Sequence, residues 1–176
     1  MTETLDTLRR YTATAPVDVV AIARGLGLDV FPAAFDDQIS GMIQRNTDGA
    51  TYSILVNAND TPERQRFTIA HEIGHYLYHR DLIGDGVADS PAYRAPDTSI
   101  YGGTRLQQRH ETQANQFAAN ILMPLDLIRS IEAREPGITL PELARRLRVS
   151  LPALRVRKGL TPYPNANEEF GMVDLD

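Results

Sequence analysis

Apolar positions follow helical spacing in some stretches of the chain and form β-rich runs in others. Between Pro16 and Gly27 they recur at helical spacing and stop at two glycines, which predicts a short amphipathic helix. Three β-rich runs follow at 29–31, 39–44 and 51–57, separated by Asp, Asn and Gly residues that favour turns. We expect a small antiparallel sheet whose last two strands pair as a hairpin.

From Thr61 onward the pattern becomes helical. Apolar residues between Phe67 and Tyr78 recur at helical spacing after a threonine cap and an early proline, which predicts a helix of several turns. Three further helical segments are expected, at 111–122, 124–135 and, as a helix-turn-helix pair, 139–160. The chain is therefore predicted to be of the α+β class, with a small sheet packed on a mostly helical domain.

The length favours one domain, since 176 residues with 42% hydrophobic content are enough for one core and few for two. The stretch 80–104 is rich in Gly and Pro and is long for a connection inside a compact domain, so it is either mobile or part of the site. We divide the single domain 1–176 into an N-terminal extension, a core, a helix-turn-helix-like element and a flexible tail, at 1–15, 16–135, 139–160 and 165–176.

Composition narrows the chemistry. The first residues contain no apolar run of signal-peptide length, and no later stretch approaches the roughly 20 apolar residues of a membrane span. We therefore expect a cytoplasmic protein without membrane contact. The chain has no cysteine, so disulfides and thiolate metal sites are excluded and any metal must be held by His and carboxylate ligands. The net charge of −5 argues against a surface that is a nucleic-acid footprint throughout.

The sequence His71-Glu72-Ile73-Gly74-His75 carries the strongest chemical signal. Residues four apart on a helix lie roughly 6 Å apart along the axis and about 40° apart around it, so both imidazoles can reach one ion. Glu72 lies beside them, placed to accept a proton from an activated water. We predict a Zn²⁺ site with these two histidines as ligands and Glu72 as the general base. Gly74 costs roughly 1 kcal/mol relative to Ala in a helix interior, which indicates close packing there.

A catalytic zinc takes three protein ligands, so a third must come from elsewhere in the chain. His79 extends the histidine stripe, but it lies about 12 Å along the helix axis from His71, too far to share the ion. Glu111 is the better candidate, although a solvated glutamate at the start of a helix fits its spacing equally well. Asn115 lies one turn further on, where its side chain can orient a ligand histidine.

Two blocks of the sequence together resemble the ImmA/IrrE family of metallopeptidases. The first, 64–79, contains the histidine pair, and the second, 111–124, begins Glu-Thr-Gln-Ala-Asn. The likeness extends more weakly over about 16–160 and leaves both ends uncovered. It implies a zinc endopeptidase with a minimal zincin domain.

The resemblance also implies roles for individual residues. By position, His71, His75 and Glu111 hold zinc and Glu72 is the catalytic base, as in thermolysin-like enzymes. Those enzymes carry an aspartate where this chain has Asn115, so an amide takes the place of the outer carboxylate.

The usual substrate in the family is a helix-turn-helix transcriptional repressor, whose cleavage relieves repression. The resemblance therefore implies such a repressor as the partner of this chain. A donor for the oxyanion of the transition state is also expected. His110, Tyr93 and Tyr101 lie in or beside the long connection and are candidates, but each fits an ordinary packing role equally well.

The segment 139–160 supports a different function. It carries six basic residues and one acidic residue, a charge of +5, whereas the remainder carries 12 basic and 22 acidic residues, a charge of −10. A basic helix-turn-helix pair can bind DNA or an acidic partner. The alternative function is a DNA- or repressor-binding regulator with a structural or vestigial metal site. The simpler explanation is a helix pair docked on the peptidase core.

Overall fold

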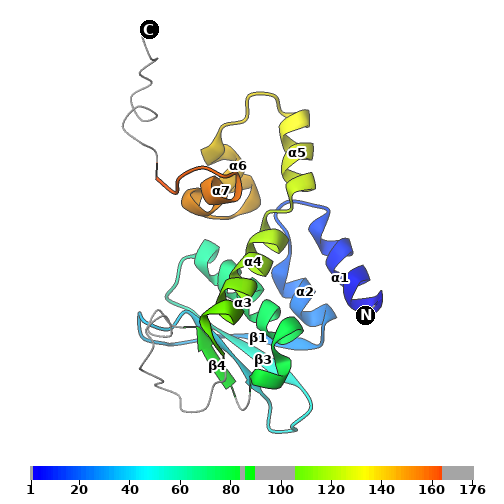
Figure 1. The fold of residues 1–176 in the computed structure, drawn as a ribbon, viewed down its shortest axis with the longest axis vertical. Helices are drawn as coiled ribbons and strands as arrows, with labels where there is room; N and C mark the ends of the chain where they lie inside the picture. Colours follow the sequence, from blue (N-terminus) through cyan, green and yellow to red (C-terminus); the bar gives the residue numbers. More distant parts are fainter. Residues whose placement is uncertain (1, 84–85, 90–105, 164–176) are drawn as a thin grey trace.

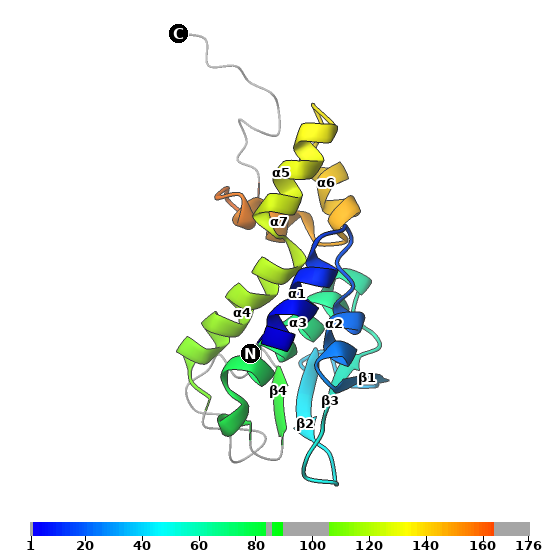
Figure 2. The same ribbon diagram turned by 90° about the vertical axis from the view of Figure 1, so that its right-hand side faces the viewer.

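The computed structural model describes residues 2–83, 86–89 and 106–163. The predicted tail at 165–176 and most of the connection 80–104 lie outside these residues. Figures 1 and 2 show the sheet at one end of the molecule, helices in the middle and the C-terminal helices at the other end. This is the α+β fold that the sequence predicts.

The sheet has four strands in the order β1-β3-β2-β4. Their bounds are Leu28–Ala33 for β1, Gly41–Arg45 for β2, Tyr52–Asn57 for β3 and Gly86–Asp89 for β4. Strands β2 and β3 pair antiparallel as the predicted hairpin, and Asp48 accepts hydrogen bonds from the backbone N–H groups of Ala50 and Thr51 in its turn.

The expectation of an antiparallel sheet is wrong in one respect, because β1 pairs with β3 in parallel. One edge of β2 is occupied by β3 and the other by β4, so β1 joins the remaining edge of β3. Strand directions alternate along β1, β2 and β3, which leaves the first and third parallel. Strand β4 was not predicted, because four residues within a Gly- and Pro-rich stretch give too short a pattern.

Helix α3 (Pro62–Tyr78) lies between the sheet and helix α4 (Gln108–Leu122) and carries the histidine pair. Thr61 caps its N-terminus by accepting a hydrogen bond from the N–H of Arg64, and a proline occupies the first turn, as predicted. Its apolar residues Ile69, Ala70 and Ile73 belong to the main core.

Close packing at Gly74 is confirmed. A Cβ atom there would lie 3.1 Å from Cα of Ala114 and 3.2 Å from the ring of Phe117 on α4. A side chain at this position would push the two helices apart, so the glycine permits the close approach of α3 and α4. This approach brings residues of the two helices into one site.

Three helices form the end of the molecule opposite the sheet (Figure 1): α5 (Leu125–Arg134), α6 (Leu140–Leu147) and α7 (Leu151–Arg157). Helices α6 and α7 are the predicted helix-turn-helix pair, with Thr139 as the N-cap of the first and Ser150 as the N-cap of the second. The turn passes through Arg148, which adopts a left-handed conformation with φ of 53°. Arg66 of α3 donates to the carbonyl of Arg148 and thereby joins this turn to the core.

Two helices precede the sheet, α1 (Thr2–Thr12) and the predicted α2 (Val19–Gly25). Helix α1 was not predicted, because few apolar positions mark it, yet Leu8 and Tyr11 pack against the core. The N-terminal extension is therefore part of the folded body. Among the described helices, none has both the length and the apolar character that crossing a membrane requires.

Candidate metal centre

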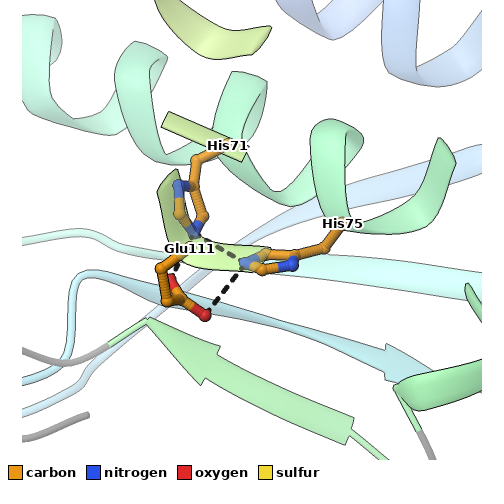
Figure 3. Close-up of side chains that lie close together, drawn as sticks. All are labelled: His71, His75 and Glu111. Atoms are coloured by element: carbon orange, nitrogen blue, oxygen red, sulfur yellow. Dashed lines mark hydrogen bonds and ion pairs between the residues drawn. The ribbon is translucent and has the colours of Figure 1, made fainter. Parts of the chain in front are cut away.

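Side chains from two helices converge in the middle of the molecule. His71 and His75 project from α3, and Glu111 projects from the first turn of α4 (Figure 3). Nε2 of His71 lies 2.9 Å from Nε2 of His75, and the two oxygens of Glu111 lie 3.3 Å and 3.4 Å from these nitrogens. The ligand atoms of the three residues all lie within 4.8 Å of one another. The structure thus brings together the three residues that the sequence singled out as ligands.

The kind of donor and the spacing both fit a zinc ion. Zinc binds imidazole nitrogen and carboxylate oxygen at about 2.0–2.1 Å, and a tetrahedral arrangement then places the donors about 3.3 Å apart. The two distances from Glu111 to the histidines match this separation, and the histidine nitrogens are slightly closer to each other. Imidazole lone pairs and a carboxylate that face one another repel unless a cation, either a proton or a metal, lies between them.

An amide holds the outer nitrogen of His71. Nδ1 of His71 lies 2.9 Å from Oδ1 of Asn115, one turn beyond Glu111 on α4. An amide oxygen only accepts, so Nδ1 of His71 carries the proton and donates it. Nε2 then presents its lone pair toward Glu111, which is the tautomer that a metal ligand needs. The structure places Asn115 where the sequence analysis expected a residue that orients a ligand.

The electrostatic environment suits metal ligation. Burial alone would raise the pKa of Glu111, but its hydrogen bonds and coulombic interactions with His71 and His75 lower that pKa well below its ordinary value. Burial lowers the pKa of His75, and neighbouring histidines lower it further against the opposing effect of Glu111. An ionised carboxylate and a neutral imidazole are the protonation states in which these side chains bind metals.

Glu72, the predicted base, lies next to His71 on α3 and is fully buried. It therefore lies in the same turn of α3 as His71, a candidate ligand. Helix geometry places it on a different face of α3 from the two histidines, since adjacent residues lie about 100° apart around the axis.

His79 lies outside the ligand group, but it contacts the group. It follows the last residue of α3, is buried, and places Nδ1 3.1 Å from Nδ1 of His75. On its other side, Nε2 of His79 lies 2.9 Å from Oε1 of Gln113 on α4. Its distance from His71 along the helix excludes His79 as a ligand, and the sequence pattern predicts no other role for it. The four-residue repeat of His71, His75 and His79 was the signal for this contact.

The three candidates for an oxyanion donor have different outcomes. His110 is buried, and its Nδ1 accepts a hydrogen bond from the N–H of Gln107 as part of the N-terminal cap of α4. Its ring packs 4.8 Å from the ring of His79. His110 thus has a structural role at the start of α4. Tyr93 and Tyr101 lie outside the described residues.

Most basic residues of the helix-turn-helix pair interact with the rest of the chain. Arg145 and Arg148 are exposed. The other four contact groups of the protein itself: Arg146 pairs with Glu135, Lys158 pairs with Glu132, Arg155 donates to the carbonyl of Thr161, and Arg157 donates to the carbonyl of Met123. Much of the local positive charge is therefore balanced or used in docking the pair.

Together, the small sheet, the histidine helix and the crossing helix with its glutamate define an α+β fold that carries a candidate metal centre of two histidines and one carboxylate. The family model described as the IrrE N-terminal-like domain, a peptidase family, matches residues 23–158. The chain belongs to this family. The predicted resemblance to ImmA/IrrE metallopeptidases is thereby confirmed.

Individual relatives carry metallopeptidase names. The chain is 44% identical over 114 residues to the radiation response metalloprotease IrrE of Deinococcus radiodurans, a match that covers 63% of this chain and 32% of the relative. It is 42% identical over 86 residues to the metallopeptidase ImmA of Bacillus subtilis, which covers 49% of this chain and 43% of the relative. The chain thus spans about a third of the IrrE protein and less than half of ImmA.

A solved structure shares the fold. It is a transcriptional regulator from Mycobacterium tuberculosis that matches 93% of this chain and 48% of its own chain with a TM-score of 0.54. At 18% sequence identity, this likeness concerns the fold alone.

Proposed function

We propose that the chain is a zinc-dependent endopeptidase in which His71, His75 and Glu111 hold the metal. The convergence of these three side chains from two helices carries the proposal, because their donor atoms have the spacing of a tetrahedral zinc site. Membership in a peptidase family and the metalloprotease names of the relatives support it.

A bound zinc ion supplies Lewis acidity, which acidifies water and polarises a carbonyl group. In the proposed reaction, Glu72 accepts the proton of the attacking water and passes it to the nitrogen of the leaving amine. Asn115 holds the imidazole of His71 in its binding tautomer throughout. Attack by water needs no covalent intermediate on the protein, so no side-chain nucleophile is required.

Substituting Glu72→Gln tests this role. General-base catalysis contributes about 10²- to 10⁴-fold, so the variant should lose at least 100-fold in cleavage. Its zinc content should stay at that of the wild type, because Glu72 is outside the ligand set. Glu132→Gln on α5 makes the same change far along the chain and should leave cleavage intact. Wild-type rates in Glu72→Gln would remove the assignment of the base.

We propose a helix-turn-helix transcriptional repressor as the substrate, met in the cytoplasm. The Deinococcus relatives are named radiation response metalloproteases, which fits the selective cleavage of a regulator better than general digestion. A groove of about 410 Å³ between α3, α4 and the start of α7 supports binding of an extended segment. It contains Asn115 beside the ligands, Phe67, and Val149 and Ala153 of the helix-turn-helix pair.

The cleavage assay needs two substrates. The first is a helix-turn-helix repressor encoded beside the gene of this chain, and the second is unfolded casein as a general substrate. Selective cleavage of the repressor with casein left intact supports the regulatory function. Cleavage of both at similar rates would support a general peptidase instead.

Direct DNA binding by the basic helix pair is the second candidate function, and its exposed residues Arg145 and Arg148 favour it. The engagement of the other four basic side chains by the protein itself favours docking of the pair on the core. Binding to duplex DNA should be measured at low salt and again at high salt. Phosphate contacts give an affinity that falls steeply with salt, and such a response would support the DNA-binding function.

A further inference from the structure

His75, the second candidate ligand histidine, is the start of a hydrogen-bonded series that continues through His79 to Gln113. Nδ1 of His75 lies 3.1 Å from Nδ1 of His79, and Nε2 of His79 lies 2.9 Å from Oε1 of Gln113. Both histidines are buried, with 1% and 5% of their surface exposed. The hydrogen-bonded series therefore starts at a candidate metal ligand and ends at the side-chain amide of Gln113 on the surface of α4.

The amide of Gln113 determines which atom donates and which accepts in both hydrogen bonds of this series. The oxygen of Gln113 only accepts, so Nε2 of His79 carries a proton and donates it. In a neutral His79 ring the other nitrogen, Nδ1, is then an acceptor. It accepts the proton of Nδ1 of His75, which leaves Nε2 of His75 with its lone pair toward Glu111.

Helix geometry explains why His79 lies between His75 and the amide of Gln113. Glu111 and Asn115 lie on nearly the same face of α4, while Gln113 is turned away from Glu111 by about 200°. His71, which faces this side of α4, is reached directly by Asn115. His75 lies one turn further along α3, and the buried ring of His79 spans the distance between it and Gln113.

We propose that His79 and Gln113 are positioning residues that fix His75 in the tautomer and orientation required for zinc binding. This inference rests on the proposed metal role of His75. In most metal sites a ligand histidine donates its outer proton to a carboxylate, a carbonyl group or a water molecule. Here a second imidazole, that of His79, takes the place of that acceptor, and it is itself held by the amide of the exposed Gln113.

Zinc affinity, measured by competition with a chromophoric chelator, tests the proposal. Loss of an outer partner of a ligand histidine typically weakens metal binding by about 10- to 100-fold, so we expect this range for His79→Phe and Gln113→Leu. His79→Asn and Gln113→Glu each retain an acceptor oxygen and should recover most of the affinity. Gln116→Leu changes another exposed glutamine of the same helix and should bind zinc like the wild type.

A spectroscopic measurement separates positioning from a general loss of structure. In zinc-loaded protein labelled with ¹⁵N, a scalar coupling between Nδ1 of His75 and Nδ1 of His79 should appear across their hydrogen bond. His79 should carry its proton on Nε2. In Gln113→Leu the folded protein should lose this coupling or show His79 in the other tautomer. Because Gln113 is exposed, we expect Gln113→Leu to fold like the wild type.

The outcomes distinguish this inference from the proposed function. Wild-type protein that binds no zinc would overturn the proposed function and this inference with it. Wild-type protein that binds zinc, with His79→Phe and Gln113→Leu binding equally well, would overturn the inference alone. A His79 protonated on Nδ1 in the zinc-loaded wild type would also overturn it, because Nδ1 of His79 could then not accept the proton of Nδ1 of His75.

Discussion

Two helix pairs of this protein are packed on opposite principles. Helices α3 and α4 bury polar side chains where they approach each other, among them His71 and His75. Helices α6 and α7 bury apolar side chains such as Leu147 and Leu154. In the second pair Arg146 and Lys158 form ion pairs at the surface, whereas Arg157 and the buried Arg155 donate to backbone carbonyls.

The difference separates the helix pair that carries the candidate metal centre from the helix pair that stabilises the fold through its apolar contacts. A buried polar group is costly unless hydrogen bonds or a cation compensate it, and in the first pair Asn115 and Gln113 supply such hydrogen bonds to His71 and His79. The proposed metal would compensate the ligand nitrogens. The second pair is stabilised mainly by the burial of its leucines. Changes in the two pairs should therefore have separable effects on metal binding and on stability.

The largest expected effect on stability is in the apolar pair. Leu147 is fully buried in the main core, and replacing a buried leucine by alanine typically costs about 2–5 kcal/mol. Leu147→Ala should lower the free energy of unfolding in urea by this amount. Its zinc affinity in the folded protein should equal that of the wild type, because the ligands and their partners lie on α3 and α4.

The matched control is Val156→Ala on α7, where the side chain is 58% exposed. A substitution at an exposed position of this kind usually changes stability by less than about 0.5 kcal/mol. A loss of zinc binding in folded Leu147→Ala would break the separation between the two pairs.

The next effect concerns the polar pair, at the close approach of Gly74 to Ala114. A methyl group there would meet the Cα of Ala114, which is backbone and cannot rotate away. Overpacking of this kind typically costs about 1–3 kcal/mol, which opposes the roughly 1 kcal/mol that alanine gains in a helix. Gly74→Ala should lower both thermal stability and zinc affinity, because it moves Glu111 away from the two histidines.

The two measurements need to be made together on this variant. Differential scanning calorimetry gives the change in stability, and chelator competition gives the change in affinity. A variant that is more stable than the wild type and binds zinc equally well would show that the helices can separate without disturbing the site.

The sequence predicts contacts between residues that are near each other along the chain, and it predicts poorly the contacts between different helices. The histidine pair is a local feature, since four-residue spacing on one helix determines the geometry. Glu111 was open on spacing alone, because its contact with His75 joins residues on different helices. His79 was set aside for the same reason. Its acceptor role depends on Gln113, which only the crossing of α3 and α4 brings near.

The fold shows the same limit. The capped helices and the β2–β3 hairpin were predictable, because short-range patterns specify them. The parallel pairing of β1 with β3 was not, because nothing in a strand's own sequence states which edge it joins. Helix α1 was missed because it is mostly polar, although its few apolar residues, Leu5, Leu8 and Tyr11, recur at helical spacing.

The smallest expected effect is at the N-terminus of α6, where Thr139 and Glu142 form a capping box. Thr139 accepts a hydrogen bond from the N–H of Glu142, and the carboxylate of Glu142 accepts from the N–H and the hydroxyl of Thr139. Replacing a capping threonine by alanine typically costs about 1 kcal/mol. Thr139→Ala should show this loss in urea unfolding with no change in zinc affinity, and Thr139→Ser should show little loss.

Acid should reduce the difference between wild type and Thr139→Ala. The hydrogen bonds with Thr139 lower the pKa of Glu142 below its ordinary value of 4.5, so the ionised carboxylate is favoured in the folded state. The resulting stability is fully present above that ordinary value and is lost as pH falls through the lowered pKa. Unfolding curves at pH 7 and at several values below 4.5 should show the gap narrowing toward acid. A gap that widens toward acid would mean that the neutral carboxyl is the better cap.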